Sequence, residues 1–557
     1  MDVSEMQRKL SQWATDDPTK RFVDLYSLLC NERWLRVAHL KVNSNDGRET
    51  AGIDGVSMSH FNDNLERNLE ELRQLLKAGT FEPLPVRRVY IPKANGKKRP
   101  LGIPGIRDRI VQEALRMILE PLWEVDFSRH SYGFRPNRST YDAIAFIGNR
   151  LASYRADSYQ WVIEGDITSY FDTIPHRRLI KAVKKRVADR KIRELLWKFL
   201  RAGVMYRGEV QETLTGTPQG GIVSPLAANI YLHELDRYME SNYLNLPYTQ
   251  RDKRRKQGKS NFLYCRYADD FVVLCNGTKA QAIAMKEELK HVLDQMGLKL
   301  SEEKTKVTHI TEGFQFLGYR IIRSIGGRGT MTPKVLIPES AIKRFQHTVR
   351  RILAPNTTHE ATTAKIEAVN QLTRGWCQYY RCTGSPGGIF GKLTHELFWE
   401  MAHWLGKKYQ LNMPAVMRRY KRVTETGTTL GTNAKTLVLL NTYKAKKLLA
   451  RPWHNPYIAK EAIIREKFIW YESLWSGNQD RQGWRDLREE VMLLKGTTCY
   501  TCGTELHPSE VEIDHVVLRA KFKDPTEADR MGNLQPICSP CHRAKTQTDL
   551  KVLSRMR

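Results

Sequence analysis

Two adjacent aspartates stand in a stretch whose other residues are those of a buried β-hairpin. The stretch is NFLYCRYADDFVVLCNG, residues 261–277, and the pair is Asp269 and Asp270. Strand interiors disfavour aspartate, and burying a carboxylate without a partner is costly. Because side chains alternate faces along a strand, we expect a hairpin tip whose bend brings the second carboxylate to the edge of one site. For an isolated pair, the alternative is a polar turn with no further role.

A third carboxylate follows another apolar strand. The segment WVIEGD ends in Asp166. If this strand lies beside the hairpin, Asp166 and Asp269 come close together, and such a pair repels itself unless divalent cations bind. Hard oxygen ligands favour Mg²⁺. Two Mg²⁺ ions roughly 4 Å apart are the clamp that polymerases use for in-line phosphoryl transfer, so the sequence predicts a site for two Mg²⁺ ions.

The C-terminal region contains a different set of metal ligands. Its four cysteines form two C-x₂-C pairs: Cys499, Cys502, Cys538 and Cys541. This spacing is typical of a tetrahedral Zn²⁺ site in a reducing compartment. The 35 residues between the pairs exceed a simple zinc ribbon and contain Asp514, His515 and Asn533, and His542 follows the second pair. The alternative is a zinc-binding DNA module in which the Asp–His pair is incidental.

Composition indicates the partner class. The 557 residues include 90 Lys and Arg against 61 Asp and Glu, a net charge of +29. Such a charge implies a polyanionic partner, most simply nucleic acid, and the length implies three or more domains. Since no run of 18 apolar residues and no apolar signal segment exist, we expect no membrane association.

Periodicity predicts the elements that must position these residues. We expect helices over 1–80, with a break at 43–55, then strand 86–92, helix 107–124, strand 160–166, a long basic helical region 176–202 and helix 222–240. The basic insert 250–260 is predicted as a charged loop, followed by the hairpin and helix 278–297. From 337 to 450 the pattern is helical and basic, and its aromatics Trp376, Tyr379 and Tyr380 favour core positions over RNA contacts.

The motifs, taken in order, resemble those of reverse transcriptases. YADDFVVL resembles the catalytic box, GDITSYFDTIPH the first carboxylate motif and TPQGGIVSPLAANIYLHELD the helix-opening motif. RRVYIPKANGKKRPLGIPGIRDRIVQEAL and HSYGFRPNRST resemble the fingers blocks of one branch, the group II intron-encoded proteins. LKLSEEKTKVTHI and FQFLGYRI resemble the last two palm motifs. The resemblance runs over roughly 50–320 and, more weakly, through the thumb and maturase region that follows.

The resemblance implies roles for five residues. Asp166 and Asp269 would ligate both Mg²⁺ ions, and Asp270 would be the third carboxylate, nearer one ion. Phe171 matches the bulky position that excludes a 2′-hydroxyl and so selects deoxynucleotides; an ordinary core aromatic is the alternative. Gln219 matches the residue that packs on the incoming nucleotide.

The resemblance also implies a grip on the triphosphate of the dNTP. Lys93 and Arg99 flank a cationic turn and would hold the phosphates by charge. Lys97 and Lys98 are equally reachable, and a solvated basic turn is the alternative. The implied reaction is attack of a primer 3′-hydroxyl on the α-phosphate, with pyrophosphate leaving.

The C-terminal unit resembles the Cys₄ form of HNH endonucleases. This implies a ββα-metal fold in which His515 is the general base that activates water for attack on a DNA phosphate. Asp514 and His542 would hold one divalent ion, and Asn533 would position His515 or the metal's surroundings. The four cysteines would bind a structural Zn²⁺ ion.

The fold class expected is multidomain α+β: a right-hand polymerase with an antiparallel palm sheet, a helical thumb and maturase region, and a ββα-metal zinc domain. The domains are predicted as an N-terminal extension with fingers, a palm, a thumb/maturase region, a linker with a DNA-binding segment, and an HNH domain, at 1–150, 151–325, 326–450, 451–489 and 490–557.

The predicted function is that of a mobile-intron protein. It would assist splicing of its group II intron RNA as a maturase, nick target DNA, and copy the RNA from the new 3′ end with dNTPs. One alternative is a splicing-only RNA-binding maturase with a decayed polymerase. The other is a reverse transcriptase of a retron or defence lineage. The oligomeric state is not predicted.

Overall fold

The computed structural model divides the chain into two units, Met1–Tyr457 and Ile458–Arg557. Each unit is described by itself. The residues described are 2–92, 96, 98–151, 159–206, 209–211, 214–217, 220–325, 331–424, 427–448, 455–458, 491–492, 495–504, 506, 511–517, 531–538, 541–542 and 544–545.

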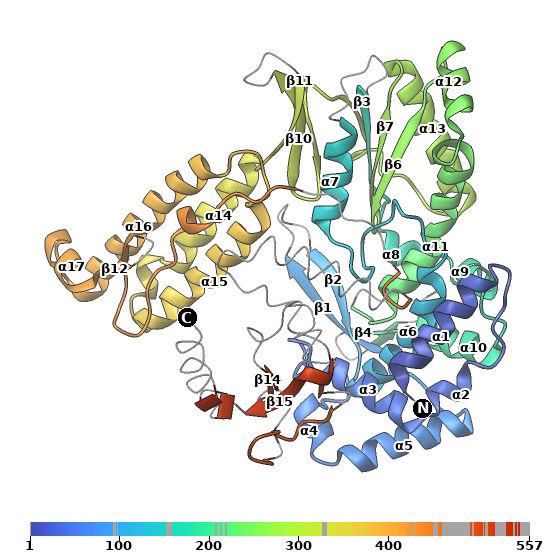
Figure 1. Cartoon of the computed structure of the whole chain (residues 1–557), viewed down its shortest axis with the longest axis horizontal. Helices are drawn as coiled ribbons and strands as arrows, with labels where there is room; N and C mark the ends of the chain where they lie inside the picture. Colours follow the sequence, from blue (N-terminus) through green and yellow to red (C-terminus); the bar gives the residue numbers. More distant parts are fainter. Residues whose placement is uncertain are drawn as a thin grey trace. The chain divides into compact units, whose positions relative to one another are not determined.

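The first unit contains a four-stranded antiparallel sheet, called the central sheet below, of which Figure 1 labels β3, β6 and β7. Its order is β6-β7-β3-β8, and its strands are Phe262–Tyr267, Asp270–Cys275, Trp161–Gly165 and Lys306–His309. β6 and β7 are the predicted hairpin, with Tyr267 paired to Asp270. β3 is the predicted apolar strand and pairs with β7, so the two segments that carry the aspartates are neighbours.

Alternation along these strands gives the sheet two buried faces. Ile163, Tyr264 and Val273 belong to a hydrophobic cluster shared with the helices α11 (Ser224–Met239) and α13 (Lys279–Gln295). Val162 and Cys265 belong to a second cluster, shared with α7 (Thr140–Leu151) and with the helices that follow the sheet. The strands of a sheet that is covered on both faces have continuous apolar sequences, as these strands do.

The helix α6 (Ile106–Glu124) organises the N-terminal part of this unit. Nearly all of its side chains are buried, and α1 and α3 pack on it. The indole Nε1 of Trp34 donates to the carbonyl of Ala114 at 3.0 Å, and the Gln7 amide donates to the carbonyl of Met117 at 2.8 Å. The first helices are α1 Val3–Asp16, α2 Tyr26–Leu29, α3 Glu32–Asn43, α4 Met58–Asn62 and α5 Leu65–Ala78. The expectation of helices with a break near 43–55 is confirmed.

A second four-stranded sheet joins segments far apart in sequence. Its order is β2-β1-β4-β5, and its strands are Lys98–Ile103, Val86–Pro92, Val204–Tyr206 and Glu209–Gln211. Along the chain, three helices lie between β3 and β4: α8 Tyr170–Thr173, α9 His176–Lys184 and α10 Arg190–Arg201. The expected single helical region 176–202 is therefore two helices, because the chain between them forms a β-bridge between the buried residues Val187 and Phe22.

The basic insert differs from its prediction. Residues 250–260 were expected to form a charged loop, but Tyr248–Lys256 is a helix, α12, that follows a π-helical turn at Glu240–Leu244. Its Gln, Lys and Arg residues have good helix propensity. Gly258, at a φ of +70°, ends the helix, with the Lys259 N–H donating to the Arg254 carbonyl at 2.8 Å. This is the Schellman pattern of helix termination, and it stabilises a helix that buries no side chain.

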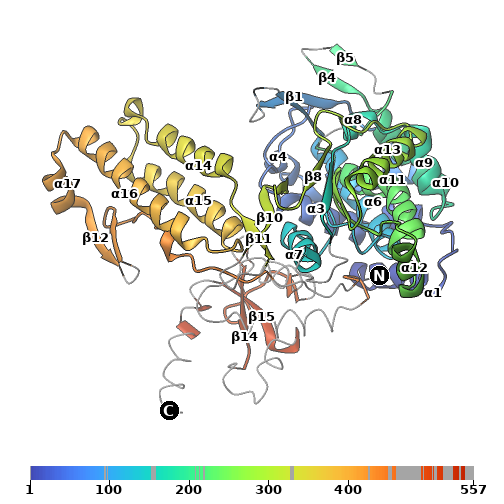
Figure 2. The ribbon, with the colours of Figure 1, turned by 90° about the horizontal axis from the view of Figure 1, so that it is seen from above.

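A three-stranded sheet and a helical bundle follow. The strands, in the order β11-β10-β9, are Met331–Leu336, Tyr319–Ile325 and Phe314–Phe316, and the helices are α14 Glu339–Ile352, α15 Thr362–Tyr380, α16 Gly387–Tyr409 and α17 Met413–Tyr420. Figures 1 and 2 both draw α14, α15 and α16 side by side. A hairpin of β12 (Lys421–Thr424) and β13 (Gly427–Leu430), which the helical pattern did not predict, comes next.

The aromatics of this bundle are core residues, as predicted. The Trp376 ring lies 4.9 Å from the ring of Phe345 and 4.8 Å from that of Tyr380. Tyr379 stacks on Tyr319 with ring centroids 5.0 Å apart. The cysteines outside the C-terminal pairs are thiols of the interior: Cys265, Cys275, Cys377 and Cys382 are buried, and Cys30 is half-buried.

The second unit contains one described antiparallel pair of strands, β14 (Val511–His515) and β15 (Leu534–Cys538). In the part of the chain that the structure describes, no helix is both long and apolar enough to cross a membrane.

Candidate active sites

The three predicted carboxylates meet where β3 ends and the hairpin turns. Asp166 follows β3 directly, and Gly165 at its end is paired with Phe271 of β7. Asp269 lies in the turn, and Asp270 begins β7. A Cβ atom on Gly165 would come within 2.2 Å of the Phe271 ring, so glycine is required for this close approach. The position of Asp166 beside the turn therefore follows from the strand register.

The electrostatic state of the three groups reflects mutual repulsion. Partial burial, followed by repulsion from Asp269 and Asp166, raises the pKa of Asp270 to about 7, although its side chain remains open to solvent. Burial, followed by the charge of Asp166, also raises the pKa of Asp269. The Lys304 ammonium pairs with the Asp166 carboxylate at 2.8 Å. A cluster that holds a proton and attracts a lysine has the charge excess that divalent cations neutralise.

A buried ion pair holds the hairpin in place, and sequence reasoning missed it. The Arg266 guanidinium, on β6, is fully buried and contacts the Asp236 carboxylate of α11 at 2.6 Å and 2.7 Å. It also donates to the carbonyl of Ala268 at 2.9 Å and to the side-chain oxygen of Asn229 at 2.9 Å. Ala268 has a φ of +58°, which is strained for alanine. Arg266 therefore supports the bend that presents Asp269.

Two of the predicted nucleotide-binding residues, Arg99 and Phe171, lie in described segments, and Arg99 is near a carboxylate. Arg99, exposed on β2, is close enough to Asp269 for its charge to lower the pKa of that carboxyl against the stronger effect of burial. Phe171, half-buried in α8, contacts Phe134 with ring centroids 6.2 Å apart, and its carbonyl accepts a hydrogen bond from the N–H of Thr217 at 2.6 Å. The other two predicted residues, Lys93 and Gln219, lie outside the described residues, as does Lys97.

Gly220 packs against the sheet β2-β1-β4-β5. Gly220 has a φ of +115°, and a Cβ atom there would come within 2.3 Å of the Gly102 carbonyl of β2. Glycine is therefore needed both for the backbone conformation and for the close approach. The contact brings Gly220 beside the strand that carries Arg99.

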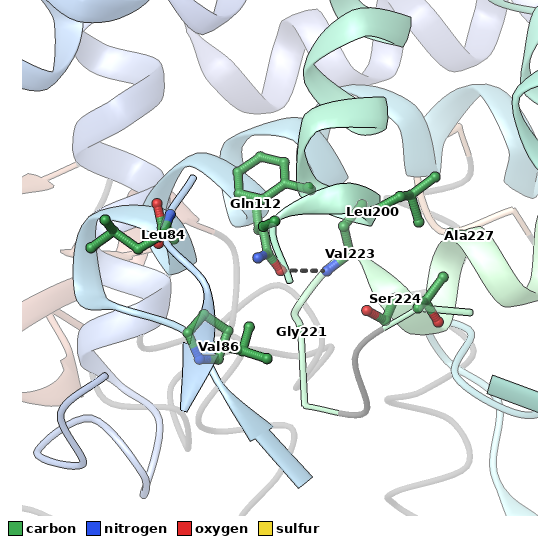
Figure 3. Close-up of a pocket in the computed structure, with 13 residues that line it drawn as sticks. Leu84, Val86, Gln112, Leu200, Gly221, Val223, Ser224 and Ala227 are labelled. Atoms are coloured by element: carbon green, nitrogen blue, oxygen red, sulfur yellow. Dashed lines mark hydrogen bonds between the residues drawn. The ribbon is translucent and has the colours of Figure 1, made fainter. Parts of the chain in front are cut away.

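A cavity of about 10 Å³ lies nearby (Figure 3). The Val223 N–H donates to the Gln112 side-chain oxygen at 3.4 Å across one of its walls. Asp108 Oδ1 and Thr217 Oγ1 are buried there without a hydrogen-bond partner, and burial raises the pKa of Asp108 to about 7. The space suits about one water molecule, which would satisfy both atoms. This cavity is therefore too small for substrate, and the hydrogen bond across it holds Val223 against α6.

The four predicted zinc ligands are brought together in the second unit. The Sγ atoms of Cys499, Cys502, Cys538 and Cys541 all lie within 4.8 Å of one another, the only such cluster of potential metal ligands among the described residues. Although burial opposes it, backbone N–H groups of Cys502, Cys538 and Thr501 lower the pKa of Cys499 to about 6. Zinc binds thiolates, so four clustered sulfurs with N–H donors fit this ion.

The predicted nuclease residues gather at the ends of β14 and β15. Asp514 and His515 end β14, and the His542 ring lies 3.8 Å from the Asp514 carboxylate and 2.5 Å from that of Glu512. The Asn533 side chain forms two hydrogen bonds with the backbone of Val517, at 2.7 Å and 3.0 Å. Asn533 thus fixes the turn after His515. Sequence reasoning missed Glu512 and also Lys545, whose ammonium lies 3.0 Å from Asp514.

Three family models match successive parts of the chain. Residues 91–321 match reverse transcriptase (RNA-dependent DNA polymerase), 342–423 match the group II intron maturase-specific domain, and 499–548 match HNH endonuclease. The first match contains the three carboxylates, and the third contains both C-x₂-C pairs and the residues beside them.

Several characterised sequences are similar along most of their length. Protein YkfC of Escherichia coli (strain K12) is 43% identical over 375 residues, which cover 63% of this chain and 97% of that protein. The group II intron-encoded protein LtrA of Lactococcus lactis subsp. cremoris is 30% identical over 634 aligned positions, 98% of each chain. The putative COX1/OXI3 intron 2 protein of Saccharomyces cerevisiae is 27% identical, covering 93% of this chain and 65% of that protein.

Proposed function

Since the chain belongs to the group II intron-encoded proteins, a family that unites reverse transcriptase, maturase and HNH endonuclease domains, we propose which residues carry each activity here. Asp166, Asp269 and Asp270 form the polymerase site, and His515 is the base of the nuclease site. Group II intron RNA, target DNA and dNTPs are the partners. The site of action is the bacterial cytoplasm, at the nucleoid, or an organelle.

The observation that carries the polymerase assignment is the convergence of three carboxylates at the ends of β3 and β7. Lys304 balances one of them, and Arg99 lies beside another. Asp166 and Asp269 would hold two Mg²⁺ ions, with Asp270 nearer one of them. When bound, Mg²⁺ lowers the pKa of the primer 3′-hydroxyl and neutralises charge at the α-phosphate.

The surroundings of the carboxylates give the nucleotide two contacts. Phe171 stands beside the turn that leads to Gln219, where its ring would exclude a 2′-hydroxyl. Arg99, together with Lys93, would hold the triphosphate through charge-assisted hydrogen bonds. Lys304 would release the Asp166 carboxylate as cations bind, because one carboxylate oxygen cannot pair with the ammonium and ligate a metal ion at full strength.

The domains assigned are those expected from the sequence. Fingers, palm and thumb form a right hand, with boundaries at 1–150, 151–325 and 326–450. The segment 451–489 would link them and contact DNA, and 490–557 would be the HNH domain with a ββα-metal fold. The two described strands of the second unit and the convergence of Asp514 and His542 support this last assignment.

In the nuclease, His515 would take a proton from the attacking water, because a histidine near neutrality can accept it. Asp514 and His542 would hold one divalent ion, which stabilises charge on the cleaved phosphate. Asn533 positions His515 by holding the next turn. The four cysteines would hold Zn²⁺ as a structural ion, since a closed tetrahedral site leaves no position for substrate.

The two alternatives are less well supported. A splicing-only maturase has no need of a carboxylate cluster, yet Asp166, Asp269 and Asp270 are all present and mutually close. A reverse transcriptase of a retron or defence lineage does not account for the matches to maturase and HNH domains.

Primer extension on an RNA template tests the polymerase assignment. The purified protein is expected to extend a DNA primer with dNTPs in Mg²⁺, and to stop when a chelator removes the metal, because the carboxylates act only through bound cations. Adding Mg²⁺ back should restore synthesis. Extension at an unchanged rate in the chelator, or no synthesis in Mg²⁺ by a folded protein, would contradict the assignment.

Sugar selection tests the role of Phe171. Phe171→Ala is expected to lower the preference for dNTPs over rNTPs by about 10- to 100-fold, the range that steric fit supplies in a pocket. The preference is measured as the ratio of kcat/KM values. Phe171→Tyr retains the ring and should retain the preference. If Phe171→Ala extends with dNTPs and still rejects rNTPs, the ring is a core aromatic only.

A further inference from the structure

A second cavity lies at the edge of the central sheet, on the strand β6. Its volume is about 220 Å³, several times the roughly 30 Å³ share of one water molecule. β6 starts at this cavity with Phe262 and ends at Tyr267, beside Asp270. At about 3.3 Å per residue, the cavity lies about 17 Å from the carboxylates. It is therefore separate from the polymerase site.

Three guanidinium groups border the cavity from three parts of the chain. Arg129 comes shortly before the segment that forms a β-bridge with β6. Arg150 lies in the last turn of α7, and Arg251 lies in α12. All three are exposed, and among the described residues none has a carboxylate within ion-pair distance. Like charges that converge on one space repel each other unless an anion binds. Arginine is well suited to phosphate, because its fork of N–H donors matches phosphate oxygens.

Aromatic side chains form part of the other walls of the cavity, beside Leu244, Asn245 and Leu263. Phe146 and Tyr243 line it, and the Arg150 guanidinium lies 5.7 Å from the Phe146 ring centre. The His130 ring lies 5.0 Å from that of Phe146. Burial, followed by the charges of Arg129 and Arg150, lowers the pKa of His130 to about 4, and its buried Nδ1 atom has no hydrogen-bond partner. Aromatic faces such as Phe146 and Tyr243 can stack on an unstacked base.

We propose that this cavity binds one unstacked nucleotide of the intron RNA, with the base between Phe146 and Tyr243 and the phosphates on Arg129, Arg150 and Arg251. The inference rests on the proposed function of intron RNA binding and names a site for it. Aromatic faces beside guanidinium groups suit a base with its phosphate better than an acidic peptide, which has no ring to stack.

The helix α12 supports this assignment. It is polar on all sides and buries no side chain, so packing alone does not explain it. Arg251 and Lys253 are exposed cations on it, whereas Arg255 and Lys256 form ion pairs with Asp252 of the same helix. Such exposed cations guide a polyanion toward the cavity by long-range attraction. The π-helical turn before α12 contributes Tyr243 to the cavity wall, and π-helical turns frequently occur at functional sites.

Binding of a 15-nucleotide single-stranded RNA to the full-length protein tests the proposal. The double variant Arg150→Glu/Arg251→Glu is expected to bind about tenfold more weakly. The slope of log affinity against log salt concentration should become shallower by about 1.4, because each of the two lost phosphate contacts contributes about 0.7 on a single strand. The matched control is Lys184→Glu/Arg237→Glu, which makes the same charge change at two exposed residues outside both the cavity and α12. It should weaken binding less than threefold.

Photo-crosslinking of the same RNA, substituted with 4-thiouridine, identifies the contact directly. Crosslinks are expected at Phe146 or Tyr243 in the wild type and in the control, and not in the cavity variant. Equal weakening by the two double variants, or displacement of the RNA by polyglutamate at equal charge, would overturn the proposal. Displacement of the crosslink by micromolar AMP would assign the cavity to a free nucleotide and overturn the RNA assignment.

Failure of this inference is distinguishable from failure of the proposed polymerase function. The cavity variant should extend a primer already annealed to RNA within twofold of the wild-type rate, because none of its changed residues touches the carboxylates. If the wild-type protein crosslinks at the cavity but extends no primer, the RNA-binding assignment of the cavity stands and the polymerase assignment is wrong.

Discussion

An Asp269→Asn variant is expected to lose about a thousandfold or more of its primer-extension rate in Mg²⁺. Asp269 is the carboxylate of the hairpin turn that would hold both ions, and asparagine is a far weaker ligand for a hard cation. A thousandfold corresponds to about 4 kcal/mol of transition-state stabilisation, a magnitude that one preorganised charge interaction supplies. Asp270→Asn should be equally or less damaging, since Asp270 is nearer one ion only.

The loss should not reflect unfolding. Burial and the charge of Asp166 raise the pKa of Asp269, so its ionised form costs free energy in the metal-free fold. That cost grows as the pH rises above the ordinary pKa of aspartate, and the neutral asparagine removes it. The melting temperature of Asp269→Asn at neutral pH should therefore equal or exceed that of the wild type. Asp294→Asn, at an exposed position on α13, is the matched control and should retain full synthesis.

A result above a tenth of the wild-type rate for Asp269→Asn would contradict the assignment of the metal site. The same conclusion would follow if Asp294→Asn lost as much activity, because Asp294 lies outside the predicted set of metal ligands. DNA nicking by Asp269→Asn provides an internal check on folding and should be unchanged.

A His515→Ala variant is expected to lose DNA nicking by about 10²- to 10⁴-fold, the usual contribution of a general base. His515 directly follows Asp514 at the end of β14, and the Asp514 carboxylate lies 3.8 Å from the His542 ring. Nicking is measured on a labelled target duplex with the protein bound to its intron RNA. Primer extension should be unchanged, because the polymerase residues all lie in the first unit.

Zinc content is the folding control for this variant. One Zn²⁺ per chain in His515→Ala would show that the cluster of Cys499, Cys502, Cys538 and Cys541 is intact. If nicking persists in a variant with full zinc content, His515 is not the base, and the second unit is a zinc-binding module whose Asp–His pair is incidental. Loss of splicing together with nicking would point to a shared structural role.

The central sheet could be predicted from sequence because its strands are buried on both faces. Long apolar runs, each ended by aspartate, predicted β3 and the β6–β7 hairpin, and their pairing then determined which carboxylates meet. The same reasoning could not find Arg266. An arginine inside an apolar strand carries no sign of its partner, and Asp236 lies thirty positions earlier on a helix. The buried pair becomes visible only when α11 packs on β6.

Other elements escaped prediction for related reasons. The insert 250–260 has no apolar positions, so no periodicity distinguished a helix from a loop; the Schellman end at Gly258 was the available signal. Lys304 lies in a polar segment far from Asp166 in sequence. The pairing of β3 with β8 and the β-bridge between Ile167 and Leu300 bring it near. In the second unit, paired cysteines predicted the metal cluster because their spacing is a local property. Glu512 became relevant only once β14 placed it beside His542.

The most direct test combines both sites in one reaction. The protein is bound to its intron RNA and given dNTPs, Mg²⁺ and a target duplex labelled on the strand to be nicked. We expect the wild type to yield the nicked strand and then longer DNA covalently joined to it. Asp269→Asn should stop at the nick, and His515→Ala should give neither product on intact duplex but should extend a duplex supplied with the nick. If His515→Ala fails on pre-nicked DNA, or Asp269→Asn extends the nicked strand, the division of labour between these two sites is contradicted.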